Sequence, residues 1–215
     1  MKWILTFVVA LLGTQQLGGA PFVREVFAKP ARYSFADVKF HVSYVPGGVP
    51  RSELPSKYPA KSGFLSAIPG GYFSLESNPL RNVDYTLRGS RVLVPYLSER
   101  QRPVILFSKR GARIAWPEKD TGGFSRSADE TDGLAGDNHC QKPERPLLRT
   151  IVGVTKSTLT VYMVRGTEDQ CHRLMSAEKY QRKQYLFMDG GDSVLPTTPM
   201  PSHIVVFKRT SRAIQ

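Results

Sequence analysis

Proline and glycine interrupt this sequence so often that long regular elements are not expected. The 215 residues include 16 prolines and 18 glycines, and both residue types weaken or break the interior of helices and strands. The chain is therefore expected to form many short elements joined by irregular loops.

The first twenty residues have the layout of a secretory signal peptide. Lys2 precedes an apolar run from Trp3 to about Gly13, and small residues lead up to Ala20. The run is roughly half of the ~20 residues that a membrane-spanning helix needs, and no later segment is apolar for long enough to span a bilayer. We therefore expect cleavage after Ala20 and a secreted or periplasmic protein. Residues 21–215 are long enough to bury a core in one domain.

The charge of the chain favours anionic partners. Thirty Lys plus Arg stand against 18 Asp plus Glu, a formal net charge of +12. Such a charge suits cell-wall polymers, phosphosugars, lipid head groups or nucleic acid. The basic residues are scattered and do not form one stripe interleaved with aromatic residues, so nucleic acid is not an expected partner.

Two cysteines, Cys140 and Cys171, are the default partners of one structural disulfide in an exported protein. Free thiols and a catalytic thiol are the alternatives, because His139 adjoins Cys140 and His172 adjoins Cys171. Adjacent residues seldom provide the geometry of a base and a nucleophile, so the disulfide is the preferred interpretation. The spacing of these four residues matches no compact zinc pattern; no metal site is predicted, and the cofactor is left unknown.

Short strands dominate the predicted secondary structure. Patterns of alternating or β-branched residues predict strands over 33–45, 64–68, 91–96, 104–108, 112–116, 150–155, 158–164, 185–188 and 203–208. Pro46-Gly47-Gly48 is expected to end the first strand, and Lys109 to Gly111 to form a hairpin turn. One helix is predicted, over 167–183. The expected class is α+β: a single domain with mixed β-sheets, short strands, few helices and long loops.

Residues 117–146 carry little hydrophobic pattern. A loop of this length in a compact domain is usually functional or disordered, and we interpret it as a lid. The DETDG segment at 129–133 does not fit the spacing of a calcium-binding EF-hand and is interpreted as a solvated acidic stretch.

Three segments place glycines or a charged side chain at the end of a predicted strand: 69-PGGYF-73, 149-RTIVGV-154 and 189-DGGDS-193. Consecutive glycines let the backbone approach a ligand and direct N–H groups at an anion. An arginine at a strand end suits bidentate phosphate binding, and an aspartate there can be an acid, a base, a nucleophile or a metal ligand. Each also has a plain structural interpretation, as a turn, a surface charge or a turn cap.

In this order the three segments resemble the phosphodiester glycosidase family. That family carries Asn-Gly-Gly-aromatic-Phe, then Arg-Thr-Ala-Ile-Gly at a strand start, then Leu-Asp-Gly-Gly-Gly-Ser, and a closing Ile-Val-Val-Phe strand. The matching segments here are 70-GGYF-73, 149-RTIVGV-154, 188-MDGGDS-193 and 204-IVVF-207, within residues 64–207. The resemblance implies an exported α/β-type domain on mixed sheets that hydrolyses a sugar-1-phosphodiester; the characterised eukaryotic activity removes N-acetylglucosamine from a phosphodiester.

The resemblance also implies roles for individual residues. Asp189 would act at the reacting sugar as acid/base or nucleophile, and Arg149 would hold the phosphate. The remaining substrate-binding candidates are glycines shaping the pocket floor and polar side chains contacting the substrate: Gly70, Gly71, Gly190, Gly191, Thr150, Asp192 and Ser193.

Two positions depart from the family pattern. Pro69 stands where the family has Asn, and it offers neither a side-chain amide nor a backbone N–H. Asp192 replaces the third glycine, where it either supplies the second carboxyl group that glycosidases commonly use or repels a phosphodiester. Other candidates for a second acid are Glu76, Asp132 and Asp137.

Two alternatives to an enzyme stay open. One is a non-catalytic periplasmic module of the same fold that binds anionic glycans, which Pro69 and Asp192 favour. The other is a basic envelope protein in which the Gly-Gly turns are only structural.

Overall fold

The computed structural model describes residues 25–26, 29–97, 100–119 and 121–209. The predicted signal peptide, 1–20, lies outside these residues, so its cleavage stays a prediction. Within the described part of the chain, no helix has both the length and the apolar character needed to cross a membrane.

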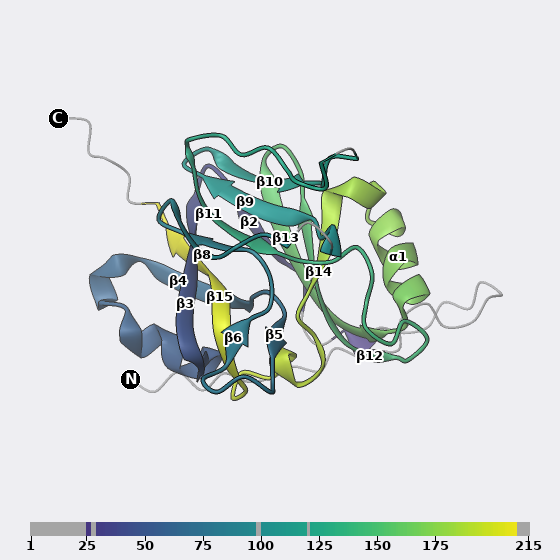
Figure 1. Cartoon of the computed structure of the whole chain (residues 1–215), viewed down its shortest axis with the longest axis horizontal. Helices are drawn as coiled ribbons and strands as arrows, with labels where there is room; N and C mark the ends of the chain where they lie inside the picture. The colour runs from purple at the N-terminus through teal and green to yellow at the C-terminus, as the bar shows by residue number, and fades with distance from the viewer. Residues whose placement is uncertain (1–24, 27–28, 98–99, 120, 210–215) are drawn as a thin grey trace.

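Strands supply most of the regular structure (Figure 1). They are β1 (Glu25–Val26), β2 (Ala31–Ser34), β3 (Val38–Pro50), β4 (Phe64–Pro69), β5 (Phe73–Ser74), β6 (Arg81–Asn82), β7 (Thr86–Arg88), β8 (Arg91–Val94), β9 (Val104–Ser108), β10 (Gly111–Ala115), β11 (Glu130–Ala135), β12 (Leu147–Val154), β13 (Thr158–Gly166), β14 (Tyr185–Met188) and β15 (Pro199–Lys208). The described helices are α1 (Glu168–Ala177) and the 3₁₀ helices η1 (Arg51–Lys57), η2 (Ala60–Ser62), η4 (Arg182–Gln184) and η5 (Gly191–Val194).

The strands form three larger sheets and one two-stranded ribbon. The helix-side sheet has the order β1-β13-β12-β14, with β2 also pairing β13; the hairpin sheet has the order β10-β9-β11-β7-β8; the central sheet has the order β3-β15-β4; and β5 pairs β6.

The predicted mixed sheets and α+β class need correction, because the described strands pair antiparallel throughout and the fold is mainly β. The segment from β13 through α1 to β14 resembles the strand–helix–strand unit of a parallel sheet. Here β13 and β14 run in the same direction but lie on opposite sides of β12, so they do not pair with each other.

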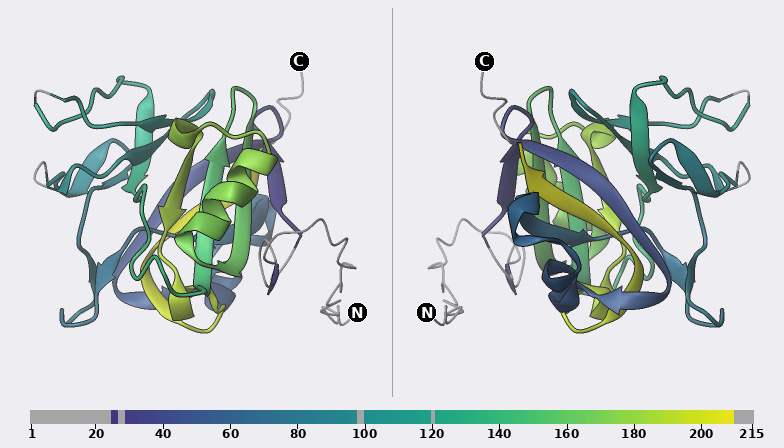
Figure 2. Two further views of the ribbon diagram at one scale, coloured as in Figure 1. Left: turned by 90° about the vertical axis from the view of Figure 1, so that its right-hand side faces the viewer. Right: turned by 90° about the vertical axis from the view of Figure 1, so that its left-hand side faces the viewer.

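The helix-side sheet is buried on both faces. Successive side chains of a strand point to opposite faces: Leu186 and Met188 of β14 join the main core, while Tyr185 and Phe187 join a second core beneath α1. Figure 2 shows α1 across the outer face of this sheet and β3 and β15 on the other side. Burial on both faces explains why β14 is a continuous apolar run.

Helix α1 begins where the sequence predicts and ends earlier. Thr167 caps it: the Thr167 hydroxyl accepts a hydrogen bond from the Gln170 N–H, and the Gln170 side chain accepts one from the Thr167 N–H. The helix ends at Ala177, before the predicted Lys183. The backbone of Lys179 then takes a left-handed conformation, φ 64°, typical of a chain leaving a helix.

The interpretation of 117–146 as one long loop is wrong, because β11 runs through it and pairs with both β9 and β7. The acidic stretch is solvated only in part, because Asp129 is exposed while Glu130 and Asp132 are buried. Asp132 is buried and accepts hydrogen bonds from the Val42 N–H at 2.9 Å and the Thr131 hydroxyl at 2.9 Å. Buried Glu130 pairs with Arg113. The partners Val42 and Arg113 come from other strands, so no local pattern reveals them.

The first predicted strand, 33–45, consists of two strands separated by a turn at residues 35–37. β3 also continues through the expected break at Pro46-Gly47-Gly48. Gly47 and Gly48 have φ values of 91° and 82°, and the register of β15 shifts opposite them, between Met200 and Ser202. A bulge of this kind lets a strand bend and continue. The β9–β10 hairpin is confirmed, with Ser108 paired to Gly111.

Candidate functional site

Asp189 lies directly after β14, at a point where three segments meet. Its N–H donates a hydrogen bond to the Gly70 carbonyl at 3.1 Å, which joins the end of β14 to the end of β4. Its carboxylate accepts hydrogen bonds from the Gly190 N–H at 2.9 Å and the Ser193 hydroxyl at 2.7 Å. Two of the three motifs, PGGYF and DGGDS, are therefore neighbours in space.

Glycines make this meeting possible. A Cβ on Gly70 would lie 2.3 Å from the Ser202 hydroxyl oxygen, and one on Gly190 would lie 2.7 Å from the Leu148 carbonyl oxygen. A Cβ on Gly71 would lie 3.0 Å from the Ala135 carbonyl oxygen, and Gly191 has a left-handed φ of 59°. The glycines thus bring the ends of β4 and β14 against β15 and β12. Their predicted contact with a substrate stays a prediction.

The carboxyl group of Asp189 has an unusual affinity for protons. Burial raises its pKa from 3.8 to about 6, although the hydrogen bonds from Ser193 and Gly190 oppose the shift. The side chain remains partly exposed. A carboxyl group with a pKa close to neutral can exchange a proton with a bound molecule, as general acid–base catalysis requires.

This pKa shift predicts how stability depends on pH. Because the folded carboxyl group holds its proton more tightly than the unfolded one, the folded state loses stability as the pH rises from about 4 through about 6. Urea denaturation at pH 4 and at pH 7 gives the unfolding free energies of the wild type and of Asp189→Asn. Between these two pH values the wild type should lose unfolding free energy relative to the variant. A constant difference would contradict the shift.

A second charged group lies over the buried ring of Tyr72, a side chain whose pKa the charge of Asp189 also affects. The Arg102 guanidinium lies over the Tyr72 ring, 4.8 Å from its centroid. Its Nε is 3.3 Å from Asp137 and 3.6 Å from Asp84. Burial raises the pKa of Tyr72, and the negative charges of Asp137 and Asp189 raise it further. The Tyr72 hydroxyl therefore stays protonated and can donate a hydrogen bond.

Asp137 and Asp189 lie on the same face of the sheet. Asp137 pairs with Phe187 through two backbone hydrogen bonds of 2.8 Å each, and Asp189 follows Phe187 by two residues. Such diagonal neighbours are separated by roughly 7–8 Å between Cα atoms. The charges of both carboxylates act on the Tyr72 hydroxyl and raise its pKa.

The other candidates for a second acid are placed differently. Asp132 is buried in β11, where backbone and side-chain donors hold it. Glu76 is exposed in the loop between β5 and β6. The side chain of Asp192 lies outside the described part of the structure, so its role stays a prediction. Of the described candidates, Asp137 is the one that shares the surroundings of Tyr72 with Asp189.

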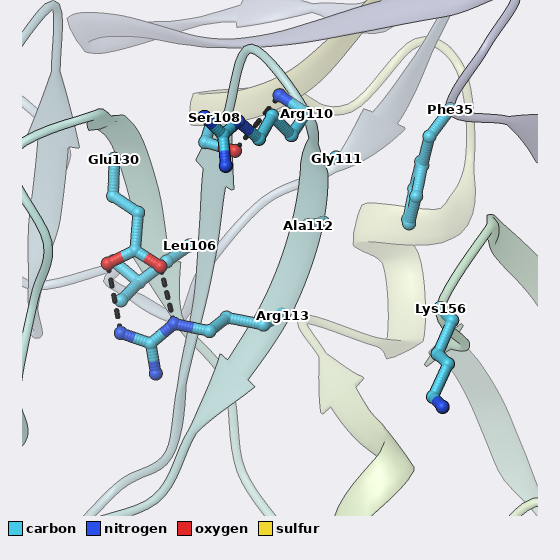
Figure 3. Close-up of a pocket in the computed structure, with 9 residues that line it drawn as sticks. All are labelled: Phe35, Leu106, Ser108, Arg110, Gly111, Ala112, Arg113, Glu130 and Lys156. Carbon is cyan, nitrogen blue, oxygen red and sulfur yellow. Dashed lines mark hydrogen bonds and ion pairs between the residues drawn. The ribbon is translucent and has the colours of Figure 1, made fainter.

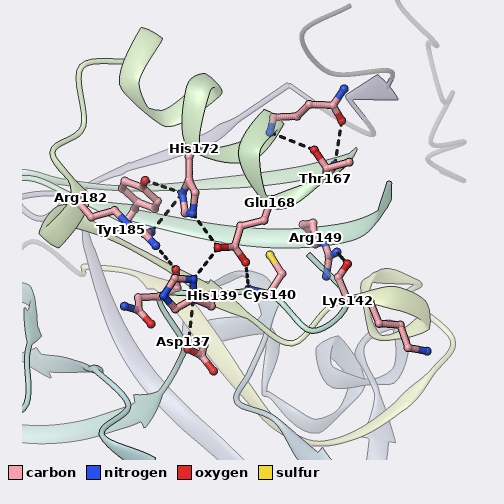
Figure 4. Close-up of polar contacts among 12 residues, drawn as sticks. Asp137, His139, Cys140, Lys142, Arg149, Thr167, Glu168, His172, Arg182 and Tyr185 are labelled. Atoms are coloured by element: carbon pink, nitrogen blue, oxygen red, sulfur yellow. Dashed lines mark hydrogen bonds and ion pairs between the residues drawn. The ribbon is translucent and has the colours of Figure 1, made fainter. Parts of the chain in front are cut away.

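Arg149 lies beside this site along the backbone but directs its side chain elsewhere. The guanidinium is buried and donates hydrogen bonds to the carbonyls of Gln141 at 2.8 Å, Lys142 at 2.9 Å and Arg145 at 3.2 Å. A longer contact of 3.5 Å reaches the Gly166 carbonyl. Figure 4 shows it next to Lys142 and Cys140. Its predicted phosphate contact would require these carbonyls to release it.

The hydroxyl groups of Ser193 and Thr150, which the sequence suggests as substrate contacts, are both buried in the structure. Ser193 is buried, and its hydroxyl binds Asp189. Thr150 is fully buried, and its hydroxyl oxygen has no hydrogen-bond partner among the described residues. Ser193 thus holds the Asp189 carboxylate, whereas Thr150 is covered by the surrounding chain.

A network at the start of α1 fixes the segment before Arg149 (Figure 4). Glu168 accepts a hydrogen bond from the Cys140 N–H at 2.6 Å, and its carboxylate lies 2.6 Å from His139 Nδ1 and 3.3 Å from His172 Nε2. Burial opposes ionisation of Glu168, but these three contacts outweigh it and lower its pKa. The His-Cys and Cys-His pairs are the only local signal of this network in the sequence.

The two thiols are free and buried in the second core, so the disulfide predicted for Cys140 and Cys171 is not present in the structure. Burial raises the pKa of each thiol to about 12, which leaves almost no thiolate at neutral pH and makes neither suited to nucleophilic catalysis.

Free buried thiols make a clear prediction. Two thiols per chain should react with a thiol reagent after unfolding in denaturant, and close to none before unfolding, because both sulfurs are shielded by the core. Protein purified without reductant is the right sample, with a reduced sample as control. Thiols detected only after reduction would contradict this expectation and support a disulfide between Cys140 and Cys171.

No group of three or more His, Cys, Asp or Glu suited to a metal ion occurs among the described residues.

No protein-family model matches the sequence, and no curated protein sequence matches it. Among solved structures, the fold is similar to the catalytic domain of zebrafish N-acetylglucosamine-1-phosphodiester alpha-N-acetylglucosaminidase, auto-inhibited by its pro-peptide. The TM-score is 0.50 at 15% sequence identity, and the match covers 82% of this chain and 74% of that chain. The fold of this chain is therefore distantly related to that of a phosphodiester glycosidase catalytic domain.

Proposed function

We propose that this protein is a glycoside hydrolase that cleaves sugar-1-phosphodiesters. The observation that carries the proposal is the Asp189 carboxyl group, partly exposed at a strand end, with its pKa raised to about 6. Asp137 and the Tyr72 hydroxyl share its surroundings. The distant similarity of the fold to a phosphodiester glycosidase supports the same reaction class.

The proposed reaction breaks the bond between the anomeric carbon and the bridging oxygen. Water supplies a hydroxyl group to the sugar, and the phosphate leaves with the bridging oxygen as a phosphate monoester. Asp189 acts either as the nucleophile or as the acid/base that moves the proton, and Asp137 supplies the second carboxyl group. Phosphate is a good leaving group, so the protein needs mainly to stabilise its charge.

Arg102 is the cation that lies beside Asp137. Its guanidinium pairs with Asp137 and Asp84, and its Nη1 is buried without a hydrogen-bond partner among the described residues. An anion that approached Tyr72 would find this group already positioned. Arg149 remains the phosphate ligand that the sequence suggests, on the condition that the carbonyls of residues 141–145 release it.

The proposal is tested by turnover. Purified protein lacking residues 1–20 is incubated with an aryl sugar-1-phosphodiester and with nucleotide sugars, and release of the free sugar is followed. Sugar release with multiple turnovers supports the proposal. Absence of turnover across a panel of sugars and leaving groups would overturn it.

A second candidate is a non-catalytic module that binds anionic glycans. The hydrogen bonds that occupy Arg149 favour it, because they remove the predicted phosphate ligand from the site. Glycan binding without turnover in the same experiments would support this candidate.

We further propose that the protein acts outside the cytoplasm after export. The layout of residues 1–20 supports this. Expression of the full chain should give a mature protein whose N-terminal residue, by mass spectrometry, is Pro21; an intact leader on purified protein would contradict export with cleavage.

A further inference from the structure

Four basic side chains line a hollow at the end of the molecule where three turns meet. The hollow has a volume of about 530 Å³ and is lined by Ser34, Phe35, Ala36, Lys109, Arg110, Lys156, Ser157 and Arg209. No acidic residue is among them. A smaller hollow of about 160 Å³, drawn in Figure 3, adjoins it and shares Phe35, Arg110 and Lys156. We call the larger one the basic hollow.

The fold holds the basic hollow in shape. Arg209 donates hydrogen bonds to the carbonyls of Phe35 at 2.9 Å, Val38 at 2.8 Å and Lys109 at 2.6 Å, so it joins the β2–β3 turn to the β9–β10 turn. The Phe35 N–H donates to the Ser157 carbonyl at 2.8 Å and adds the β12–β13 turn.

Glycine is required at position 111, where the β9–β10 turn leads into β10. A Cβ on Gly111 would lie 2.5 Å from Cδ2 of the Phe35 ring, and its φ is 152°. The ring can therefore pack directly on the β10 backbone and form the buried floor between the turns. The turns that carry the cations are thus joined around one floor, and the side chains of Lys109, Arg110 and Lys156 are exposed at these turns.

Most of the positive charge here is not neutralised by the protein. Lys109, Arg110 and Lys156 form no ion pair with an acid of the described residues, whereas Arg113 beyond them is paired with Glu130 (Figure 3). Two other acids lie nearby. Asp129 is fully exposed, binds the Ser127 hydroxyl and lies in the field of Arg110 and Arg113; Asp37 follows the turn at Phe35. Three cations facing one hollow still leave an excess of positive charge.

We propose that the basic hollow binds a phosphate group, either free or carried on a sugar. Phosphate carries up to two negative charges and several acceptor oxygens, so more than one cation of the lining can contact it. The hydroxyls of Ser34 and Ser157 lie in the same lining and can donate to further oxygens. A carboxylate has one charge and two oxygens, which would leave part of this charge unpaired.

The basic hollow is separate from the Asp189 site. Thr150, in the middle of β12, pairs with Met188 next to Asp189, whereas Val154 ends β12 and leads into the turn that carries Lys156. At about 3.3 Å per residue, the four steps from Thr150 to Val154 span roughly 13 Å along β12, and Lys156 lies two residues further on. The inference thus goes beyond the proposed hydrolysis and does not depend on it.

Titration followed by amide NMR tests the proposal. Inorganic phosphate and glucose 6-phosphate are added separately to the wild type at low ionic strength, where exposed charges are least screened. The variant Lys109→Gln/Arg110→Gln/Lys156→Gln removes three charges from the hollow. The control Lys61→Gln/Arg173→Gln/Lys183→Gln removes the same charges from exposed positions elsewhere. Asp189→Asn serves as a second control.

We expect saturable shifts at residues 34–36, 108–111 and 155–157 in the wild type and both controls. Dissociation constants for the hollow variant should rise roughly tenfold or more, because each lost exposed ion contact weakens binding severalfold. Equal affinities for the two probes identify free phosphate as sufficient, and tighter glucose 6-phosphate adds a sugar contact. Equal weakening in the charge-matched control, shifts spread over the surface, or no saturation would overturn the proposal.

Discussion

Replacing Asp189 with asparagine is expected to lower kcat/KM for a sugar-1-phosphodiester by roughly 10²–10⁴-fold, the range for loss of an acid–base group. The amide has nearly the same shape and can still accept the hydrogen bond from the Gly190 N–H, but it can neither take up a proton nor act as a nucleophile. Because the substitution removes a carboxylate whose ionisation burial opposes, thermal stability at pH 7 should be unchanged or higher.

The experiment compares initial rates and thermal unfolding of the wild type, Asp189→Asn and Asp129→Asn, the last being an exposed acid as matched control. Asp137→Asn is the companion variant, and it should also lose most activity if Asp137 is the second carboxyl group. The pH profile of kcat/KM should bend near pH 6 in the wild type and lose that bend in Asp189→Asn. Full activity in Asp189→Asn would remove Asp189 from the reaction.

Replacing Arg149 with alanine is expected to cost about 3 kcal/mol of unfolding free energy, because a buried charge-assisted network is removed. Carbonyls of three residues, 141, 142 and 145, lose their donor, and the segment before β12 loses its attachment. For a chain of this size the melting temperature should fall by roughly 6–12 °C.

Arg173→Ala is the control for this variant, since Arg173 is exposed on α1 and its loss should be nearly neutral. Calorimetry gives the stability, and KM measured well below the melting temperature separates the two roles of Arg149. A purely structural role leaves KM close to that of the wild type; a phosphate ligand raises it. An unchanged melting temperature would mean that the loop carbonyls do not depend on Arg149.

Local signals predict local structure well. The apolar run from Tyr185 to Met188 matches the bounds of β14, and the Thr167 cap marks the start of α1. Gly190, which follows Asp189, and Gly70, which lies beside it, also point to a place where backbones approach closely, because only glycine fits against Leu148 and Ser202. These features depend on neighbours in the sequence or on the absence of a side chain, and both are visible in the sequence.

Long-range partners cannot be predicted in the same way. Arg102 lies over Tyr72 and beside Asp137, just before β9, and nothing near position 102 announces this contact. The strand through Asp132 is not predicted for the same reason, since it pairs with β7 and β9 and the Asp132 carboxylate binds the Val42 N–H. The sequence suggests Arg149 as a ligand for phosphate, while carbonyls of its own chain occupy it. In each case the sequence shows a charge but not what compensates it.

The position of β15 between β3 and β4 has a consequence for how the protein folds. Val206 pairs with Phe40 on one side and Ser66 on the other, so the middle strand comes from a part of the chain far from both of its neighbours. Closing such long loops slows folding. Until β15 arrives, β3 and β4 each present an unpaired apolar edge that can recruit another chain. The rate at which this one strand docks should therefore set the balance between folding and aggregation.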